Sequence, residues 1–319
     1  MNILSLNISD LGGLSYSLCE AINKLTPHYA INVVATRTFT LKPVMANLKR
    51  QIFLGNEEKF RSNVRRWVKN ADVIHLNEKW HCIQSYGLTA KNCRHKKIIY
   101  HVHGSIFRRN SAILLKKFRK LFPYLKIITS TPDLLKYIPR RKATWFPSIV
   151  PIEKYRQTYR IKRNNPPIIY YSPTGSSTKI MKAVLNRVAK ELKREGLKVE
   201  LNVTTKTLHS TNMKRKAKTD IYYDEIEPSP FYGVNAIEAA VFGMNVICNM
   251  NNYARQYMKN RKIKCPFLIA STEEQLKQHL RKLITNKAYR NRRGRANYQY
   301  VLKTHSPSVC LKRFFKLVE

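Results

Sequence analysis

The feature that most constrains the fold is a regular alternation of short β-rich runs with helical patterns. In the first half, five runs read as strands: 2–8, 30–36, 72–77, 97–104 and 126–131. Helical patterns lie between them, including an amphipathic one at 111–122. Strands that alternate with helices pair in parallel and are covered on both faces, so we expect α/β parallel sheets.

A second α/β series begins after prolines interrupt the pattern near residue 150. Its expected strands are 167–174, 198–205, 219–226 and the "NVIC" run, with a helix at 179–196. The final stretch, 306–319, reads as a capped amphipathic helix. We therefore expect two Rossmann-like domains, 1–150 and 151–319, with the C-terminal helix closing back toward the N-terminal domain.

Charge is the outlier of the composition. Sixty Lys and Arg against nineteen Asp and Glu give a net charge of +41. Such an excess predicts a polyanionic partner, nucleic acid first and an anionic membrane surface second. The codon bias of an AT-rich genome is the alternative source of lysine, although it accounts less readily for paired arginines, which stand at 65–66, 108–109, 140–141 and 292–293.

The cysteines and the termini favour a cytoplasmic protein, in the host cell if the source is viral. None of the six cysteines forms a CxxC pair, so reduced and mostly buried thiols are expected. The N-terminus lacks the basic leader of a signal peptide, and no apolar run is long enough to span a bilayer. Any membrane contact would be peripheral.

Three places combine a strand end with residues suited to ligands. Gly12 and Gly13 precede a helix whose free N–H groups could bind a phosphate. The same glycines are also typical of a tight strand-to-helix turn that binds nothing. His101 and His103 share one side of a strand, but no third ligand has clear spacing, so we expect substrate contact rather than a metal. Lys179 follows a small-residue loop and could counter a diphosphate charge.

A lone carboxylate, Glu238, stands in the apolar run "GVNAIEAAVFGMNVIC". The longer stretch "DIYYDEIEPSPFYGVNAIEAAVFGMNVIC" resembles the C-terminal signature of family-4-type retaining glycosyltransferases, which have the GT-B fold. Other pieces follow the family's order: "SDLGGLSYSL", "ADVIHLN", "YHVHGS" and "SPTGSSTK". The resemblance covers nearly the whole chain and implies two Rossmann-like domains that face a central cleft.

The resemblance also implies roles for particular residues. Glu238 would accept the ribose hydroxyls of a UDP- or GDP-sugar donor, and His103 would reach the transferred sugar, which makes these two the expected catalytic residues. The expected donor-binding residues are Gly12, Gly13, Ser176, Lys179, Tyr232, Gly233 and Glu238. Such enzymes retain anomeric configuration and typically need no metal, so no tightly bound cofactor is expected.

Two departures from the family pattern stand at the donor site. Pro230 replaces a glutamate that contacts the sugar, and Ser176 replaces an arginine beside the phosphate lysine, a loss that Lys182 could offset. Both leave the donor's identity open. They also keep alive a different class of function, an inactive GT-B protein that only binds nucleic acid.

Basic residues cluster after His103. Residues 105–142 hold eleven Lys and Arg and a single acid, and 59–69 places Trp67 among arginines. The candidate nucleic-acid residues are Arg65, Arg66, Arg108, Arg109, Lys116, Lys117, Arg119 and Lys120. By analogy with bacteriophage DNA glycosyltransferases, we expect the acceptor to be a hydroxymethylated pyrimidine taken out of the duplex. A peripheral membrane glycosyltransferase acting on a lipid-linked or surface glycan is the alternative enzyme.

Overall fold

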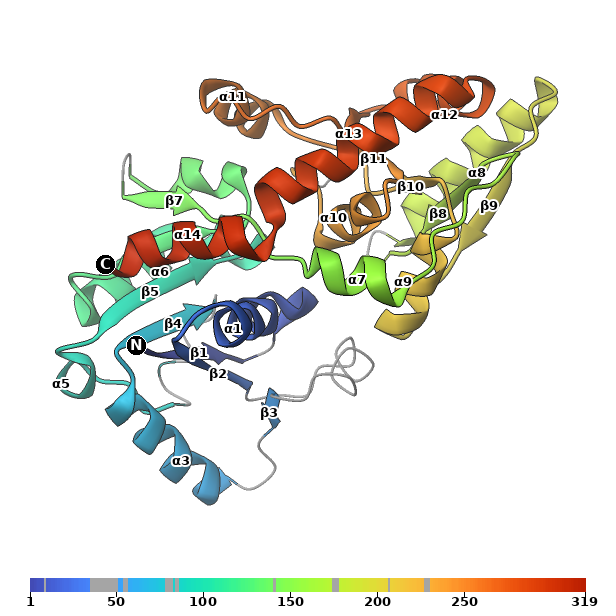
Figure 1. Cartoon of the computed structure of the whole chain (residues 1–319). Coiled ribbons are helices and arrows are strands. Elements are labelled where there is room, and N and C mark those ends of the chain that lie inside the picture. Colours follow the sequence, from blue (N-terminus) through green and yellow to red (C-terminus); the bar gives the residue numbers. More distant parts are fainter. Residues whose placement is uncertain are drawn as a thin grey trace. The chain divides into compact units, whose positions relative to one another are not determined.

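The alternating strands and helices divide into two α/β units (Figure 1). Unit 1 joins Met1–Ile149 to Pro307–Glu319, and unit 2 is Val150–Ser306. The computed structural model describes residues 1–8, 10–34, 51–53, 57–77, 83, 86–139, 142–173, 178–205, 207–226 and 230–319. The division places the C-terminal helix with the residues of the first half of the chain.

Unit 1 is built on a seven-stranded parallel sheet with the order β3-β2-β1-β4-β5-β6-β7. Its strands are β1 (Asn2–Asn7), β2 (Tyr29–Val34), β3 (Gln51–Phe53), β4 (Val73–Asn77), β5 (Lys97–Val102), β6 (Lys126–Thr129) and β7 (Ala143–Trp145). The five strands expected from the first half are confirmed. The chain moves outward from β1 to β3 and returns to β4, so the order reverses between β1 and β4.

Helices cover both faces of this sheet because successive strand residues point to opposite sides. On one face, Leu4 and Tyr100 pack with α3 (Glu57–Asn70), α5 (Ala90–Cys93) and α6 (Gly104–Leu121). On the other face, Ile3 and Ile99 pack with α1 (Leu14–Leu25) and α14 (Pro307–Val318). Two 3-10 turns, η1 (Leu11–Gly13) and η2 (Pro132–Tyr137), complete the unit.

The C-terminal helix α14 belongs to the core of unit 1. Cys310, Leu311, Phe314 and Val318 are buried along one side of it, at helical spacing. Phe314 packs edge-on against Phe146, and the Cys310 thiol lies 3.5 Å from the carbonyl of Pro147. The expected amphipathic helix is confirmed.

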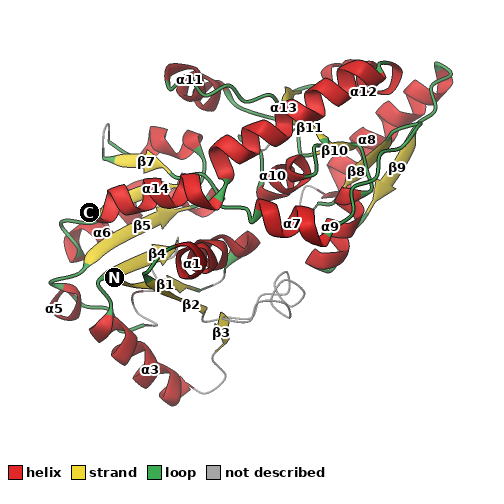
Figure 2. Ribbon diagram, in the orientation of Figure 1, coloured by secondary structure: helices red, strands yellow, loops and turns green. Residues whose placement is uncertain are grey.

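Unit 2 holds a five-stranded parallel sheet with the order β12-β11-β10-β8-β9. Its strands are β8 (Ile168–Tyr171), β9 (Glu200–Val203), β10 (Ile221–Tyr223), β11 (Asn245–Cys248) and β12 (Leu268–Ile269). Strands β8 and β9 lie side by side in Figure 2. The chain leaves β8 for β9 on one side and then places β10 on the other. The order therefore reverses between β8 and β10.

Two sets of helices enclose the sheet of unit 2. Tyr171 and Tyr223 point into a core with α8 (Thr178–Arg194) and α12 (Glu273–Thr285). Tyr170 and Tyr222 point to the other face, which carries α9 (His209–Ala217) and α10 (Val234–Val241). Helix α13 (Lys287–His305) packs on α10, and α7 (Ile152–Thr158) and α11 (Asn252–Asn260) complete the unit. Within the described ranges, no helix is long and apolar enough to cross a membrane.

Candidate functional site

In each unit the order reversal marks the place where a ligand is expected. Doubly wound sheets bind ligands beyond the carboxyl ends of the strands, at the point where the strand order reverses. In unit 2 that point lies beyond β8 and β10, at Ser172 and Asp224. In unit 1 it lies at the ends of β1 and β4, at Asn7 and Asn77. Polar side chains gather near both.

Glu238 of α10 lies in a buried polar network of unit 2. It is 5% exposed, and its two carboxylate oxygens accept separate hydrogen bonds. Lys216 Nζ donates to Oε2 at 2.6 Å, and His209 Nε2 lies 2.7 Å from Oε1. Lys216 also donates to Asn235 Oδ1 at 2.7 Å and lies over the ring of Tyr222. The network is held by two helices, α9 and α10, against β10.

The electrostatics of this network keep Glu238 ionised. Burial by itself would raise the pKa of the Glu238 carboxyl, but Lys216 and His209 outweigh it and lower the pKa to about 2. Burial lowers the pKa of the Lys216 ammonium, and Glu238 opposes that shift. Each carboxylate oxygen can accept a second hydrogen bond, so the group remains able to receive hydroxyls.

A second carboxyl, Asp224, stands at the N-terminus of the same helix. Its Oδ2 accepts a hydrogen bond of 3.0 Å from the backbone N–H of Gly233, the residue that caps α10. Burial raises the pKa of Asp224 to about 6, although the bond from Gly233 opposes the shift. The amide of Gly233, an expected donor-binding residue, is therefore already engaged by the Asp224 carboxyl.

The other expected donor-binding residues of unit 2 are not all part of this network. Lys179 is exposed in the first turn of α8, and Lys182 is exposed one turn later. Ser176 lies outside the described residues. The Tyr232 hydroxyl is buried and bonded to Tyr300 and to His305 Nε2, so any donor contact at this position would come from its backbone.

In unit 1, the paired glycines form the turn into α1. Gly12 and Gly13 have φ of +68° and +65°, in the left-handed region where a side chain is strained. The amide groups of Ser15 and Tyr16 in the first turn donate to Asp10, at 3.1 and 2.9 Å. A carboxylate of the chain thus occupies two of the N–H groups that the sequence offers to a phosphate.

His103 belongs to a cluster of three histidines at the carboxyl ends of β4 and β5. His103 Nε2 lies 3.0 Å from Asn77 Oδ1, and its ring lies 4.1 Å from that of His101. His101 Nδ1 is 3.1 Å from His75 Nε2, and His75 Nδ1 is 3.0 Å from Ser5 Oγ. Three neighbouring strands, β1, β4 and β5, therefore contribute to one polar chain that ends at His103.

The histidines of this cluster are neutral. Burial lowers the pKa of His75 to about 3 and that of His103 to about 4, and it lowers the pKa of His101 well below its usual value. The oxygen of Asn77 can only accept, so a neutral His103 donates from Nε2 and carries its lone pair on Nδ1. That nitrogen is buried and has no hydrogen-bond partner among the described groups.

The candidate nucleic-acid residues differ in how exposed they are. Arg109, Lys116, Lys117 and Lys120 are exposed along α6, whereas Arg108 is partly buried and donates to Asp133 at 2.8 Å. Arg119 is half-buried. Arg65 and Arg66 are exposed on α3, and Arg66 lines a hollow of about 300 Å³ with Asn2 and Tyr29, the first residues of β1 and β2. Arg66 therefore lies near the amino ends of the strands, whereas His103 lies at their carboxyl ends.

Comparison with known proteins identifies the fold. No family model matches the sequence, and no curated protein matches it. Among solved structures, an alpha-glucosyltransferase in complex with UDP aligns over 100% of this chain and 99% of its own, with a TM-score of 0.70 and 12% identity. An alpha-glucosyltransferase in complex with UDP and a 13-mer DNA containing an HMU base aligns over 100% of this chain and 99% of its own, with a TM-score of 0.70 and 13% identity. Anabaena HepE in complex with UDP aligns over 99% of both chains, with a TM-score of 0.65 and 12% identity.

The chain has the fold of these glycosyltransferases. At such low identity the likeness establishes the fold, the two-sheet GT-B architecture, and leaves activity to the residues themselves. The part of the chain that is described contains no group of three or more His, Cys, Asp or Glu placed to hold a metal ion.

Within this glycosyltransferase fold, the structure adds residues that the sequence analysis did not select. Lys216 and His209, the partners of Glu238, are seven residues apart and so lie on one side of a helix. This spacing is visible in the sequence, but Lys216 stands in the basic run "KRKAK", where nothing distinguishes it from the neighbouring lysines. His75 and Asn77 alternate on one strand, as His101 and His103 do, which was a readable sign of a shared face.

Proposed function

We propose that this protein is a glycosyltransferase that moves a sugar from a UDP- or GDP-sugar, with retention, onto a hydroxymethylated pyrimidine in DNA. The observation that carries the proposal is the full-length match to an alpha-glucosyltransferase whose complex holds UDP and DNA with an HMU base. The net charge of +41 supports a polyanionic acceptor. We assign the donor's ribose to unit 2 and the acceptor to unit 1.

Glu238 is the residue we assign to the donor's ribose. Its low pKa keeps it an acceptor-only group, which is what a pair of ribose hydroxyls needs. Lys216 and His209 fix its position on α10, so little entropy is lost when the donor binds. Lys179 and the turn at Gly12 and Gly13 keep the role that the resemblance gives them, contact with the diphosphate.

His103 is the residue we assign to the transferred sugar. The resemblance gives this histidine contact with the transferred sugar, and its place at the carboxyl end of β5, beside the point where the strand order reverses, supports that role. His75 and His101 are neutral, so the cluster adds no positive charge beside the reacting carbon. Exposed Arg109, Lys116 and Lys120 on α6 would hold DNA phosphates while the target base leaves the stack.

The proposed step exchanges one bond for another. The bond between the sugar's anomeric carbon and the donor phosphate oxygen breaks, and that carbon bonds to the hydroxymethyl oxygen of the base. The acceptor's proton passes to the departing diphosphate on the same face. Catalysis then consists of positioning both substrates and stabilising the leaving charge.

The test is mass spectrometry of nucleosides from hydroxymethylcytosine-containing duplex DNA incubated with the protein and a panel of UDP- and GDP-sugars. We expect a hexose or pentose mass gain with one donor. Glu238→Gln should lower the rate about 10- to 100-fold, the effect of losing a hydrogen bond to a charged group. Glu200→Gln, at an exposed glutamate that starts β9, is the matched control and should retain the rate.

Two outcomes would overturn the proposal in different ways. Sugar transfer to a lipid-linked glycan on anionic liposomes, with none to DNA, would make the protein a peripheral membrane glycosyltransferase. Intact DNA binding without hydrolysis of any nucleotide sugar would make it a binding protein that has lost its chemistry.

A further inference from the structure

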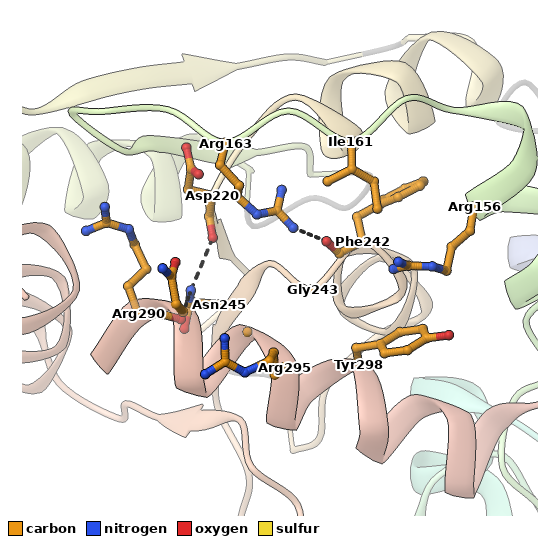
Figure 3. A pocket seen from close by; sticks show the side chains of 12 residues that line it. Arg156, Ile161, Arg163, Asp220, Phe242, Gly243, Asn245, Arg290, Arg295 and Tyr298 are labelled. Atoms are coloured by element: carbon orange, nitrogen blue, oxygen red, sulfur yellow. Dashed lines mark hydrogen bonds between the residues drawn. The ribbon is translucent and has the colours of Figure 1, made fainter. Parts of the chain in front are cut away.

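A cationic pocket lies in unit 2, away from the sheet edge assigned to the donor. It has a volume of about 270 Å³, and its lining includes Arg156, Arg163, Arg290 and Arg295, with Asp220 the single acid (Figure 3). Asp220 precedes β10, and Asn245 is the first residue of β11. The pocket therefore lies at the amino ends of these parallel strands, whereas Asp224 and Ser172 mark the carboxyl ends.

Two separate segments bring the arginines together. Figure 3 shows Arg163 and Ile161 entering from one side, and Arg295 and Tyr298 of α13 from the other. Close approach of α13 to the loop after α10 is possible because Gly294 has no side chain: a Cβ there would lie 2.3 Å from the carbonyl oxygen of Gly243. The backbone thus allows α13 to bring its arginines to the loop.

The fold accounts for some of these arginines but not for all of them. Arg156 donates to the carbonyl of Val241 at 2.9 Å and Arg163 donates to that of Phe242, so both serve the C-terminal end of α10. Arg290 is 5% exposed and donates to the carbonyls of Leu283 and Ile284. Arg295 is exposed and has no hydrogen bond or ion pair with any described residue.

The single acid of the pocket is already engaged. Asp220 Oδ2 accepts from Asn164 Nδ2 at 2.8 Å and from the backbone N–H of Ile168 at 3.0 Å, and Oδ1 accepts from the Asn164 N–H at 3.1 Å. These bonds tie the segment before β8 to the start of β10. Arg295 is thus left as an unpaired cation among other cations, which favours binding of an anion.

The surroundings point to a long anion rather than an isolated one. The segments 154–163 and 287–295, which supply the four arginines, each hold five basic residues and no acidic one. Arg160, Lys162, Lys287 and Arg292 of these segments are exposed. The pocket, about 270 Å³ in volume, has room for a phosphate group.

We propose that this pocket binds a backbone phosphate of nucleic acid, so that unit 2 adds its own contact to DNA. The inference rests in part on the proposed function, since it takes the same acceptor class, but it concerns a different site. The contact would be independent of base sequence because phosphates carry no sequence information. Arginine suits it because its planar fork pairs with two phosphate oxygens at once.

The experiment measures binding to an unmodified 20-base-pair duplex by fluorescence anisotropy over a series of salt concentrations. Arg295→Ala should lower the slope of log K against log salt by about one, the loss of one phosphate contact. Arg295→Glu should weaken binding about tenfold or more, because it also repels the phosphate. Arg194→Glu is the matched control, an exposed arginine of α8 with the same charge change, and should alter affinity less than twofold.

Each result has a defined meaning. Equal losses in Arg295→Glu and Arg194→Glu, with strong binding by the wild type, would overturn the pocket alone. Binding to phosphatidylserine vesicles is measured in parallel. If Arg295→Glu weakens binding to the vesicles but leaves DNA binding intact, the site binds lipid headgroups, and the nucleic-acid partner is overturned. Absence of DNA binding in the wild type would overturn both the pocket and the DNA acceptor, whereas hydrolysis of nucleotide sugars, measured in parallel, would still test the enzyme.

Discussion

Lys216 Nζ lies 2.6 Å from Glu238 Oε2, and the lysine side chain has no exposed surface. The carboxylate that the sequence singles out is therefore matched by a buried cation from a neighbouring helix. Breaking such a pair leaves an uncompensated charge inside the unit. The pair fixes the charge and position of Glu238 before any ligand binds.

Lys216→Met should lower the free energy of unfolding of the protein by about 3–5 kcal/mol at pH 7, because Glu238 would lose its main partner. Urea unfolding measures the effect. Lys214→Met, at an exposed position on the same helix, should change it by less than about 0.5 kcal/mol. Equal losses in both variants would mean that the buried pair contributes nothing particular.

The histidine cluster should make unit 1 sensitive to acid. The pKa of His75 is about 3 when folded and near 6.5 when unfolded, so the unfolded chain takes up its proton first as pH falls. Stability from this residue is complete above about pH 6.5 and is lost as pH falls toward 3. Between pH 7 and pH 5 the loss is about 2 kcal/mol.

His75→Gln should remove that part of the pH dependence, because glutamine does not titrate in this range. Unfolding in urea at pH 7 and pH 5 gives the difference for each variant. His95→Gln, at an exposed histidine of the same unit, should leave the wild-type pH dependence in place. The assignment is wrong if His75→Gln loses as much stability on acidification as the wild type.

Tyr232→Phe separates packing from donor binding. The hydroxyl lies in a buried contact with Tyr300 and His305, so its removal should cost about 1–2 kcal/mol of unfolding free energy. The KM for the nucleotide sugar should stay unchanged, since only the backbone of Tyr232 is left to contact the donor. A rise in KM without loss of stability would return the hydroxyl to the donor site.

Gly294→Ala should destabilise the protein by about 2–3 kcal/mol, although alanine is a better helix former than glycine. The added Cβ would lie 2.3 Å from the carbonyl oxygen of Gly243. Both atoms are attached directly to the backbone, so a side-chain rotation cannot relieve the clash. Thermal unfolding measures the change. Gly233→Ala is the comparison: its Cβ would lie 3.8 Å from Asp224 Oδ2, an ordinary contact, and should be tolerated.

Most strands and helices, and the α/β class, could be predicted from the residue pattern alone. Short apolar and β-branched runs predicted β1, β2, β4, β5, β6, β8, β9, β10 and β11, because a strand shows this pattern whichever strands lie beside it. They also placed Glu238 on a helix, and His101 on a strand with His103 directly after its end. Periodicity reports which side of an element is buried, and these assignments needed nothing more.

Which residues contact one another depends on the packing of the elements. Ser5 and His75 are seventy residues apart and bond because strand order places β1 beside β4. Lys216 and its exposed neighbours look alike in sequence, and the packing of α9 on α10 alone selects Lys216 as the partner of Glu238. Strand direction likewise places Arg66 near the amino ends of the strands and His103 at their carboxyl ends. A helical or strand period fixes the direction of a side chain, but its partner depends on the elements that pack beside it.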